Sequence, residues 1–326
     1  MAAPVPIARV VRSGLEESVH TGHVAVCDAD GKIVARAGDA EREVFIRSCA
    51  KPLQAAVSLA AIGDEAIPDR EIAVMCASHN AEPVHLGAVR ALLARADLGP
   101  GALLTPPSFP LDPDEMARSQ HRHPLFSDCS GKHAGMLLAC VRSGWDLATY
   151  AKKSHPLQRR VRRAVDRATG VPDPRVGVDG CGVPVLGVPL RAIATLYARL
   201  GEPERLAELG PAAARAVEAM LAEPYLVGGR DRIDTTLMQS APGIVVKEGA
   251  EGLVCASLPG FGLGVALKVA DGGFRAAGPA MVDVLGQLDA LDADERHALV
   301  SLGGPAVLGG GRRVGTIEPV VRLRRR

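Results

Sequence analysis

The sequence predicts an α+β fold, in which strands from the two ends of the chain form one antiparallel sheet and helices fill the middle. The first 45 residues have β-strand patterning, most of 48–240 is helical in character, and β-strand patterning returns from residue 242. Strands segregated from helices in this way favour α+β over alternating βαβ units. No repeat or low-complexity linker interrupts the 326 residues. We therefore expect a single domain over 1–326, with a helical lobe at roughly 48–240.

The N-terminal strands are indicated by residues 23–38, where two β-prone runs flank Asp-Ala-Asp-Gly, a hairpin signal. A helix is expected from about Ser48, because apolar residues then recur at helical spacing. Pro52 fits only in the first turn of this helix, where its missing N–H matters least. Ser48 and Lys51 are therefore expected at the start of the helix.

Further helices are expected over 82–98, 133–144, 156–168, 186–200 and 204–222. The stretch 100–128, rich in Pro and His, is expected to be a long irregular loop, and such loops tend to be functional. Residues 243–272 contain three short β runs joined by glycine turns, and a helix over about 278–291 follows them.

The composition excludes several classes of function. The chain is 47% apolar and 23% charged, with a formal net charge of +1, so we expect no nucleic-acid or anionic membrane partner. No run approaches the roughly 18–20 apolar residues of a membrane-spanning helix. The opening residues lack an apolar stretch of signal-peptide length, and the seven cysteines form no C-x-x-C motif. These features predict a reduced, cytoplasmic protein.

Ser48 and Lys51 are candidates for catalysis because residues three apart on a helix face the same side. A lysine amine can take the serine proton only if its pKa is lowered, by desolvation or by a second cation. Lys247 and Lys132 are candidates for that cation. The alternative is a helix-capping serine beside an exposed lysine, since S-x-x-K is common by chance.

A second hydroxyl and a second amine accompany this pair. Ser78 and Asn80 lie in the motif CASHN, where an apolar run ends. Lys247 ends a predicted strand before a glycine turn, and in Ser/Lys hydrolases such an amine stands behind a proton-relaying serine. The alternatives are a capping Ser78 and a surface Lys247.

Two glycine-rich motifs, DCSGKHAG and DGCGVP, resemble places where the backbone approaches a ligand closely. Gly131 and Gly182 would free neighbouring N–H groups to face an anion. Cys129 and Cys181 could share a zinc ion, and His133 could add a ligand, although two thiolates fall short of the usual four-ligand set. The alternative is two buried cysteines packed in turns.

The motifs RSCAKPLQ, CASHN, CSGKHAGML, DGCGVP and KEGAEG occur together in an order that resembles one known family. The chain resembles the L-asparaginase family typified by the Rhizobium etli inducible enzyme, from its N-terminal strands to about residue 318. The resemblance implies a fold like that of serine β-lactamases and glutaminases. It also implies a homodimer that hydrolyses L-asparagine to L-aspartate and ammonia.

The resemblance also implies roles for individual residues. Ser48 with Lys51 and Ser78 with Lys247 match the two Ser–Lys pairs of the family, and Cys129, Lys132 and Cys181 match its Zn²⁺ site. A lysine binds zinc only as a neutral amine, so the pKa of Lys132 would have to be strongly lowered. Every motif residue is present.

Substrate-binding roles are expected for residues next to the motif positions, namely Arg47, Asn80, Gly131, His133, Asp179 and Gly182. By charge complementarity, Asp179 would meet the α-amino group of asparagine and Arg47 its carboxylate. The sequence leaves two other hypotheses open. One is a glutaminase, or a β-lactam or ester hydrolase, of the same fold. The other is an amino-acid-binding or metal-binding protein without catalysis.

Overall fold

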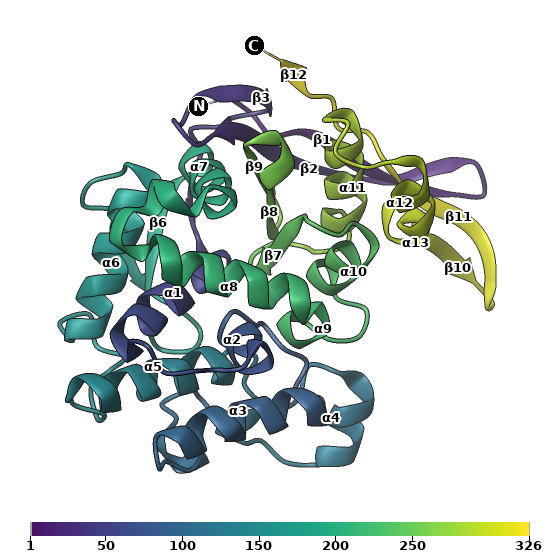
Figure 1. Cartoon of the computed structure of the whole chain (residues 1–326). Helices are drawn as coiled ribbons and strands as arrows, with labels where there is room; N and C mark the ends of the chain where they lie inside the picture. The colour runs from purple at the N-terminus through teal and green to yellow at the C-terminus, as the bar shows by residue number, and fades with distance from the viewer. Residues whose placement is uncertain (1, 326) are drawn as a thin grey trace. The chain divides into compact units, whose positions relative to one another are not determined.

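The computed structural model describes residues 2–325, which form two compact units (Figure 1). The sheet unit contains residues up to 49, 188–202 and those from 236 onward, and the helical unit contains 50–187 and 203–235. The single-domain expectation for 1–326 stays a prediction. Among the described residues, no helix has both the length and the apolar character needed to cross a membrane.

The sheet unit is built on one antiparallel sheet, in the order β10-β11-β1-β2-β9-β8-β7, with β3 paired to β2 and β12 paired to β3. Its strands are β1 (Val5–Arg12), β2 (Leu15–Asp28), β3 (Ile33–Ala37), β7 (Val245–Gly249), β8 (Leu253–Leu258), β9 (Leu263–Val269), β10 (Ala306–Gly309), β11 (Arg312–Pro319) and β12 (Arg324–Arg325). N-terminal β2 pairs with C-terminal β9, Val24 lying opposite Leu267. The predicted α+β class is therefore confirmed, as are the three β runs after residue 242.

Helices pack against this sheet at close range. In the described part of the chain, four helices belong wholly to the sheet unit: α7 (Leu190–Gly201), α11 (Ala277–Gln287), α12 (Ala293–Ala298) and α13 (Val300–Gly303). The short strand β4 (Glu43–Phe45) belongs to the same unit. Helix α7 packs on β9 and β2. A β-carbon at Gly264 of β9 would overlap the Ala194 carbonyl and the Ala198 amide of α7. The approach of α7 to the sheet therefore requires glycine at position 264.

The helical unit surrounds a central buried helix. Its helices are α1 (Lys51–Ile62), α2 (Asp69–Met75), α3 (Pro83–Arg95), α4 (Pro113–Ser119), α5 (Ser130–Ser143), α6 (Pro156–Thr169), α8 (Gly210–Ala222) and α9 (Pro224–Val227). Helix α1 packs against α2, α5, α6 and α8, and every residue from Lys51 to Leu59 is buried. A helix buried on all sides belongs to a core. Its first residue, Lys51, is therefore held in the interior.

Short elements complete the chain. The 3₁₀ turns are η1 (Arg47–Ala50), η2 (Pro100–Ala102), η3 (Pro124–Phe126), η4 (Pro203–Leu209) and η5 (Pro259–Phe261). Strands β5 (Arg175–Val178) and β6 (Pro184–Pro189) form an antiparallel hairpin, with Val178 opposite Pro184. Helix α10 (Ile233–Ser240) crosses the sequence boundary between the units.

Three expectations about secondary structure were wrong in part. The helix expected over 186–200 begins at Leu190, because residues 184–189 form β6, which pairs with β5. The helix expected over 204–222 begins only at Gly210, after the turn η4. The stretch 100–128 contains α4, whose N-terminus is capped by the Asp112 carboxylate accepting from the Glu115 N–H at 2.9 Å.

We expect Gly264→Ala to destabilise the sheet unit by about 1–3 kcal/mol, because the new methyl group has no room beneath α7. Chemical denaturation measures this difference. Gly260→Ala is the matched control, since a β-carbon at Gly260 has no neighbour within 4 Å, and it should change the stability by less than about 0.5 kcal/mol. Equal stabilities of the two variants would contradict the packing described for α7.

Candidate active site

Ser78 lies in the irregular segment that follows α2, and backbone hydrogen bonds hold this segment from two directions. The Ser78 N–H donates to the Val227 carbonyl at 2.9 Å, and the His79 N–H donates to the Asp128 carbonyl at 3.2 Å. Both partners are distant in sequence, so the position of Ser78 is fixed by tertiary structure. The prediction that Ser78 lies at the end of an element is confirmed.

The His79 side chain fastens the same segment to α5. Its Nδ1 accepts from the Ala81 N–H at 3.1 Å, so the ring proton is on Nε2, which donates to Ser130 Oγ at 2.9 Å. Ser130 Oγ in turn donates to the Leu125 carbonyl at 2.9 Å. Burial, aided by the nearby His85, lowers the pKa of His79 well below its usual value. This tautomer belongs to a neutral ring, which agrees with the lowered pKa. Through its two hydrogen bonds, His79 positions the segment that carries Ser78.

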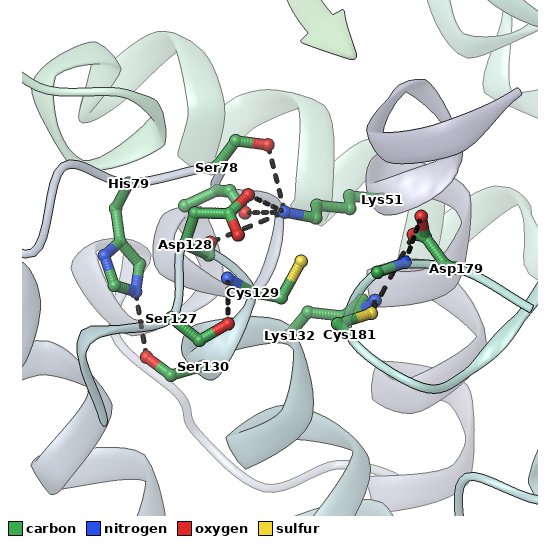
Figure 2. A network of polar contacts seen from close by, with 12 residues as sticks. Lys51, Ser78, His79, Ser127, Asp128, Cys129, Ser130, Lys132, Asp179 and Cys181 are labelled. Carbon is green, nitrogen blue, oxygen red and sulfur yellow. Dashed lines mark hydrogen bonds and ion pairs between the residues drawn. The ribbon is translucent and has the colours of Figure 1, made fainter. Parts of the chain in front are cut away.

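The Lys51 amine is the centre of the polar network in the helical unit (Figure 2). Its Nζ donates to the Ala77 carbonyl at 2.6 Å and to Ser78 Oγ at 2.9 Å. A longer hydrogen bond of 3.4 Å reaches the Asp128 carbonyl, and the Asp128 carboxylate lies 3.5 Å from the amine. The side chain of Lys51 is 1% exposed. Three acceptors and one counter-charge thus compensate the buried ammonium.

The charge state of Lys51 differs from the one that the sequence suggested. Burial acts to lower the pKa of Lys51, but electrostatic interactions with Cys129 and with the Asp128 carboxylate outweigh burial, so this pKa is raised. Desolvation likewise opposes ionisation of Asp128, but the Lys51 ammonium holds the pKa of that carboxyl below its usual value. Lys51 is therefore an ammonium that donates a hydrogen bond to Ser78, and Asp128 is its carboxylate partner.

Cys129, Lys132 and Cys181 gather beside this network, as Figure 2 shows. Lys132 Nζ donates to Cys181 Sγ at 2.9 Å. A hydrogen bond from Cys129, together with the charge of Lys132, lowers the pKa of Cys181 far below its usual value despite burial. The same hydrogen bond, with burial, raises the pKa of Cys129 well above its usual value. The cluster is a thiolate held between an ammonium and a thiol.

A tight turn between β5 and β6 presents Cys181 to this cluster. The Gly182 N–H donates to the Asp179 carbonyl at 2.9 Å, and the Asp179 carboxylate accepts from the Gly180 N–H at 2.9 Å. Gly182 has φ +92°, a conformation that suits glycine. Its N–H is committed to the turn, and the expectation that neighbouring N–H groups face an anion stays a prediction. Asp179 shapes the turn, and its carboxylate also lies 3.8 Å from Cys181 Sγ.

The zinc hypothesis depends on which donors this cluster can offer. Among residues 2–325, no three His, Cys, Asp or Glu side chains are grouped so that they could hold a metal ion. Two sulfur atoms therefore become a three-donor set only if the Lys132 amine joins them. Burial alone would lower the pKa of Lys132, but electrostatic interactions with Cys129 and with the Cys181 thiolate raise it. Zinc binding there requires the loss of the Lys132 proton, and a metal cation bound to the two sulfur atoms would favour that loss.

Gly131 and His133, expected near the substrate, have packing roles in α5. A β-carbon at Gly131 would overlap the Val74 carbonyl, so this glycine allows α5 to lie against α2. His133 is fully buried, and its Nδ1 lies 2.8 Å from the Tyr150 hydroxyl. Burial lowers the pKa of His133, although the neighbouring Cys181 partly offsets the effect.

The Asn80 side chain is bound within the protein. Its Nδ2 donates to the Arg230 carbonyl at 2.9 Å, and its Oδ1 accepts from Arg232 at 3.0 Å. Glu82, which is buried, accepts from the Arg230 N–H at 3.0 Å. Asn80 therefore organises the loop that contains Arg230 and Arg232. Neither arginine was singled out from the sequence, because neither lies in one of the motifs.

In the sheet unit, the segment that contains Ser48 lies against β7. The Cys49 thiol donates to the Lys247 carbonyl at 3.2 Å, and a β-carbon at Gly249 would be 3.2 Å from the Ser48 nitrogen. Ser48 and Lys247 are both buried. Arg47 has φ +48°, an uncommon conformation for a residue with a side chain, and its guanidinium is 4.0 Å from the Glu251 carboxylate.

The pairs assigned from the sequence, Ser48 with Lys51 and Ser78 with Lys247, stay predictions. Within the helical unit, the serine to which Lys51 donates a hydrogen bond is Ser78. Asp128 is the participant that the sequence analysis missed. Asp128 is the first residue of the motif DCSGKHAG, which was the sequence feature that could have indicated it. Its ionic partner, Lys51, is distant in the sequence, so the pair could not be found from local spacing.

The sequence matches the L-asparaginase II family over residues 8–319. The chain belongs to the L-asparaginase II family. It is therefore an amidohydrolase that hydrolyses L-asparagine, and its substrate is a small molecule. This membership supports the asparaginase hypothesis over that of a non-catalytic binding protein.

The chain is also similar to solved structures that are distant from it in sequence. A β-lactamase from Mycobacterium bovis has 18% identity and a TM-score of 0.46, covering 83% of this chain and 95% of its own. A covalent complex of the Bacillus subtilis glutaminase YbgJ has 15% identity and a TM-score of 0.38, covering 83% and 89%. A search of curated proteins found no match. The functional conclusion rests on the family match.

We expect Asp128→Asn to lower the pKa of Lys51 by about 1–3 pH units, because the substitution removes a negative charge 3.5 Å from the ammonium. NMR of the lysine Cε carbons in metal-free protein measures this shift, and the Lys51 signal is identified by its loss in Lys51→Met. Asp114→Asn is the control, since Asp114 is exposed and pairs with Arg230. An unchanged Lys51 titration in Asp128→Asn would contradict the ion pair.

Proposed function

We propose that the chain is an L-asparaginase of the Rhizobium etli inducible type, which cleaves the side-chain amide of L-asparagine with two serines and two lysines. The observation that carries the proposal is the hydrogen bond of 2.9 Å from the buried Lys51 ammonium to Ser78 Oγ. An ammonium in contact with a hydroxyl is suited to supplying a proton to a leaving group. Family membership gives the leaving group, which is ammonia.

In the proposed acylation, Ser48 Oγ attacks the side-chain amide carbon of asparagine, and the Ser48 proton passes to Lys51. The proton that Lys51 already holds against Ser78 moves through the Ser78 hydroxyl to the amide nitrogen. The carbon–nitrogen bond breaks, ammonia departs, and an aspartyl ester remains on Ser48. Because Lys51 gives up one proton and gains another, this route needs no lowered pKa in the resting enzyme.

In the proposed deacylation, water attacks the aspartyl ester, Ser48 Oγ regains a proton, and L-aspartate leaves with release of one further proton. Lys247 is the second amine of this scheme and supports Ser78 in proton transfer, as the resemblance implies. Arg47 and Asp179 are proposed to meet the substrate carboxylate and amino group, on grounds of charge.

We also propose that Cys129, Lys132 and Cys181 hold Zn²⁺. The proposal is supported by the low pKa of the Cys181 thiol and by the contact of 2.9 Å between Lys132 Nζ and Cys181 Sγ. Thiolates are preferred zinc ligands, and a neutral lysine amine would add a third donor. Zinc bound there would attract polar groups of the substrate. The proton transfers above use Ser48, Ser78 and Lys51.

The serine roles predict different outcomes for two substitutions. Ser48→Ala should lower kcat for asparagine by about 10³-fold or more and abolish the acyl adduct. Ser78→Ala should lower kcat by about 10²–10⁴-fold, because proton delivery is lost, while an adduct still forms on Ser48. Ammonia release from asparagine and from glutamine, and mass spectrometry with a slow substrate, provide the measurements.

Ser58→Ala is the matched control for these variants, because Ser58 is a buried serine of α1 whose hydroxyl bonds to the Gln54 carbonyl. It should retain the activity of the parent. An adduct found on Ser78 and absent from Ser48 would reverse the two roles. Faster ammonia release from glutamine than from asparagine would refute the proposed substrate preference.

The metal proposal predicts that the purified enzyme contains about one zinc ion per chain and that Cys181→Ser loses most of it. Mass spectrometry of the metal content tests this directly. Cys140→Ser, at a buried cysteine of the same helix as Lys132, should retain zinc. Equal zinc in the Cys181→Ser variant and the parent would exclude this site.

We further propose that the enzyme works as a homodimer in the cytoplasm, as the resemblance implies. All seven cysteines are free, which suits a reducing compartment. Sedimentation velocity of the purified enzyme tests the dimer.

A further inference from the structure

The helical unit contains a cavity of about 710 Å³ between α6, η4 and one face of α1. Its volume lies in the range of small-molecule sites, roughly 300–1,000 Å³. The described residues that line it include none of the network around Lys51 and Cys181. The cavity is therefore a separate feature that asparagine hydrolysis does not explain.

The cavity combines an apolar floor with a basic rim. Leu53 and Val57 of α1 and Leu206 of η4 form part of the floor, and all three are buried. The rim carries four arginines: Arg160, Arg163, Arg167 and Arg205. The first three are spaced three and four residues apart on α6, so they project from one face of that helix.

The positive charge at the rim is only partly neutralised. Glu208 also lines the cavity and forms an ion pair with Arg167. Arg160 lies over the ring of Trp145, 4.8 Å from its centre. Within residues 2–325, Arg163 forms no ion pair. Like charges three or four residues apart repel each other on a helix, and an anion bound at the rim would offset this repulsion.

The wall of the cavity also contains an unusual backbone conformation. Ala207 in η4 has φ +51° and ψ −127°, which a residue with a β-carbon rarely adopts. Such conformations persist where the surroundings impose them, and they gather at ligand sites. Here the conformation lies between Leu206 of the floor and Glu208 of the rim.

We propose that this cavity binds a small phosphorylated metabolite, in which an apolar or aromatic body lies on the floor and the phosphates pair with the rim arginines. Guanidinium groups bind phosphate oxygens in pairs of parallel hydrogen bonds, so arginine suits this ligand better than lysine does. A nucleotide and an acyl-coenzyme A share this chemistry. The experiment below separates them.

The test uses the full-length enzyme and its tryptophan fluorescence. The chain has one tryptophan, Trp145, on which the rim residue Arg160 stacks, so a ligand that engages Arg160 should change the emission. ATP, octanoyl-coenzyme A and inorganic triphosphate are titrated in turn, with calorimetry as a second measurement. At least one of the first two should bind saturably, and about tenfold more tightly than inorganic triphosphate, which has no apolar body.

Charge reversal on α6 tests the location of the site. Arg163→Glu should weaken binding about tenfold or more, because it replaces an attraction with a repulsion. Arg159→Glu is the matched control, because Arg159 is exposed on the same helix but does not line the cavity, and it should change affinity less than about threefold. Arg205→Ala, on η4, provides an independent test if Arg163→Glu fails to fold, as judged by thermal unfolding.

Several results would overturn the proposal. Absence of saturable binding by either organic ligand would do so, as would equal affinity for inorganic triphosphate. Unchanged affinity in Arg163→Glu and in Arg205→Ala would place any binding elsewhere. Sedimentation velocity adds a further criterion: if Arg163→Glu dissociates a dimer while neither ligand binds the parent, the cavity is covered by a second copy of the chain.

Discussion

The buried ammonium of Lys51 is the constraint on which the helical unit depends. A charge removed from water is costly unless hydrogen bonds and a counter-charge replace the solvent. The Lys51 ammonium contacts the Ala77 carbonyl and the Ser78 hydroxyl in one segment, and the carbonyl and carboxylate of Asp128 in another. The ammonium is therefore stabilised only when the segment that carries Ser78 and the start of α5 are both correctly placed. The charge that suits the chemistry is therefore also a condition for correct packing.

Charge balance extends through the neighbouring cluster. Lys51 is compensated by Asp128, and Lys132 is compensated by the Cys181 thiolate, so two cations are matched by two anions in a region with little solvent. Removing one member of such a set leaves an unpaired buried charge, which typically costs about 3–5 kcal/mol. Charge balance with the Cys181 thiolate therefore accounts for the buried Lys132 without a metal. The same three side chains, Cys129, Lys132 and Cys181, are the donors that a metal would meet.

Local patterns in the sequence predicted the elements whose signals are local. The strands β7 to β9 and the helix that begins near Lys51 were recognisable from spacing. The errors occurred where tertiary structure overrides local preference. Residues 184–189 form a strand because they pair with β5, and the ion pair between Lys51 and Asp128 joins residues brought together only by packing. The Asn80 amide holds the loop at Arg230 and Arg232, and its expected contact with substrate stays a prediction.

The enclosure of α1 has a consequence for how this enzyme can diverge. Because every residue from Lys51 to Leu59 is buried among neighbouring helices, α1 cannot slide or rotate without repacking several of them at once. New substrate preferences would therefore arise through segments outside α1, such as the turn at Asp179 and the loop at Arg230 and Arg232. Libraries that vary those segments and leave α1 intact should yield a larger fraction of folded proteins than libraries that vary the helix itself.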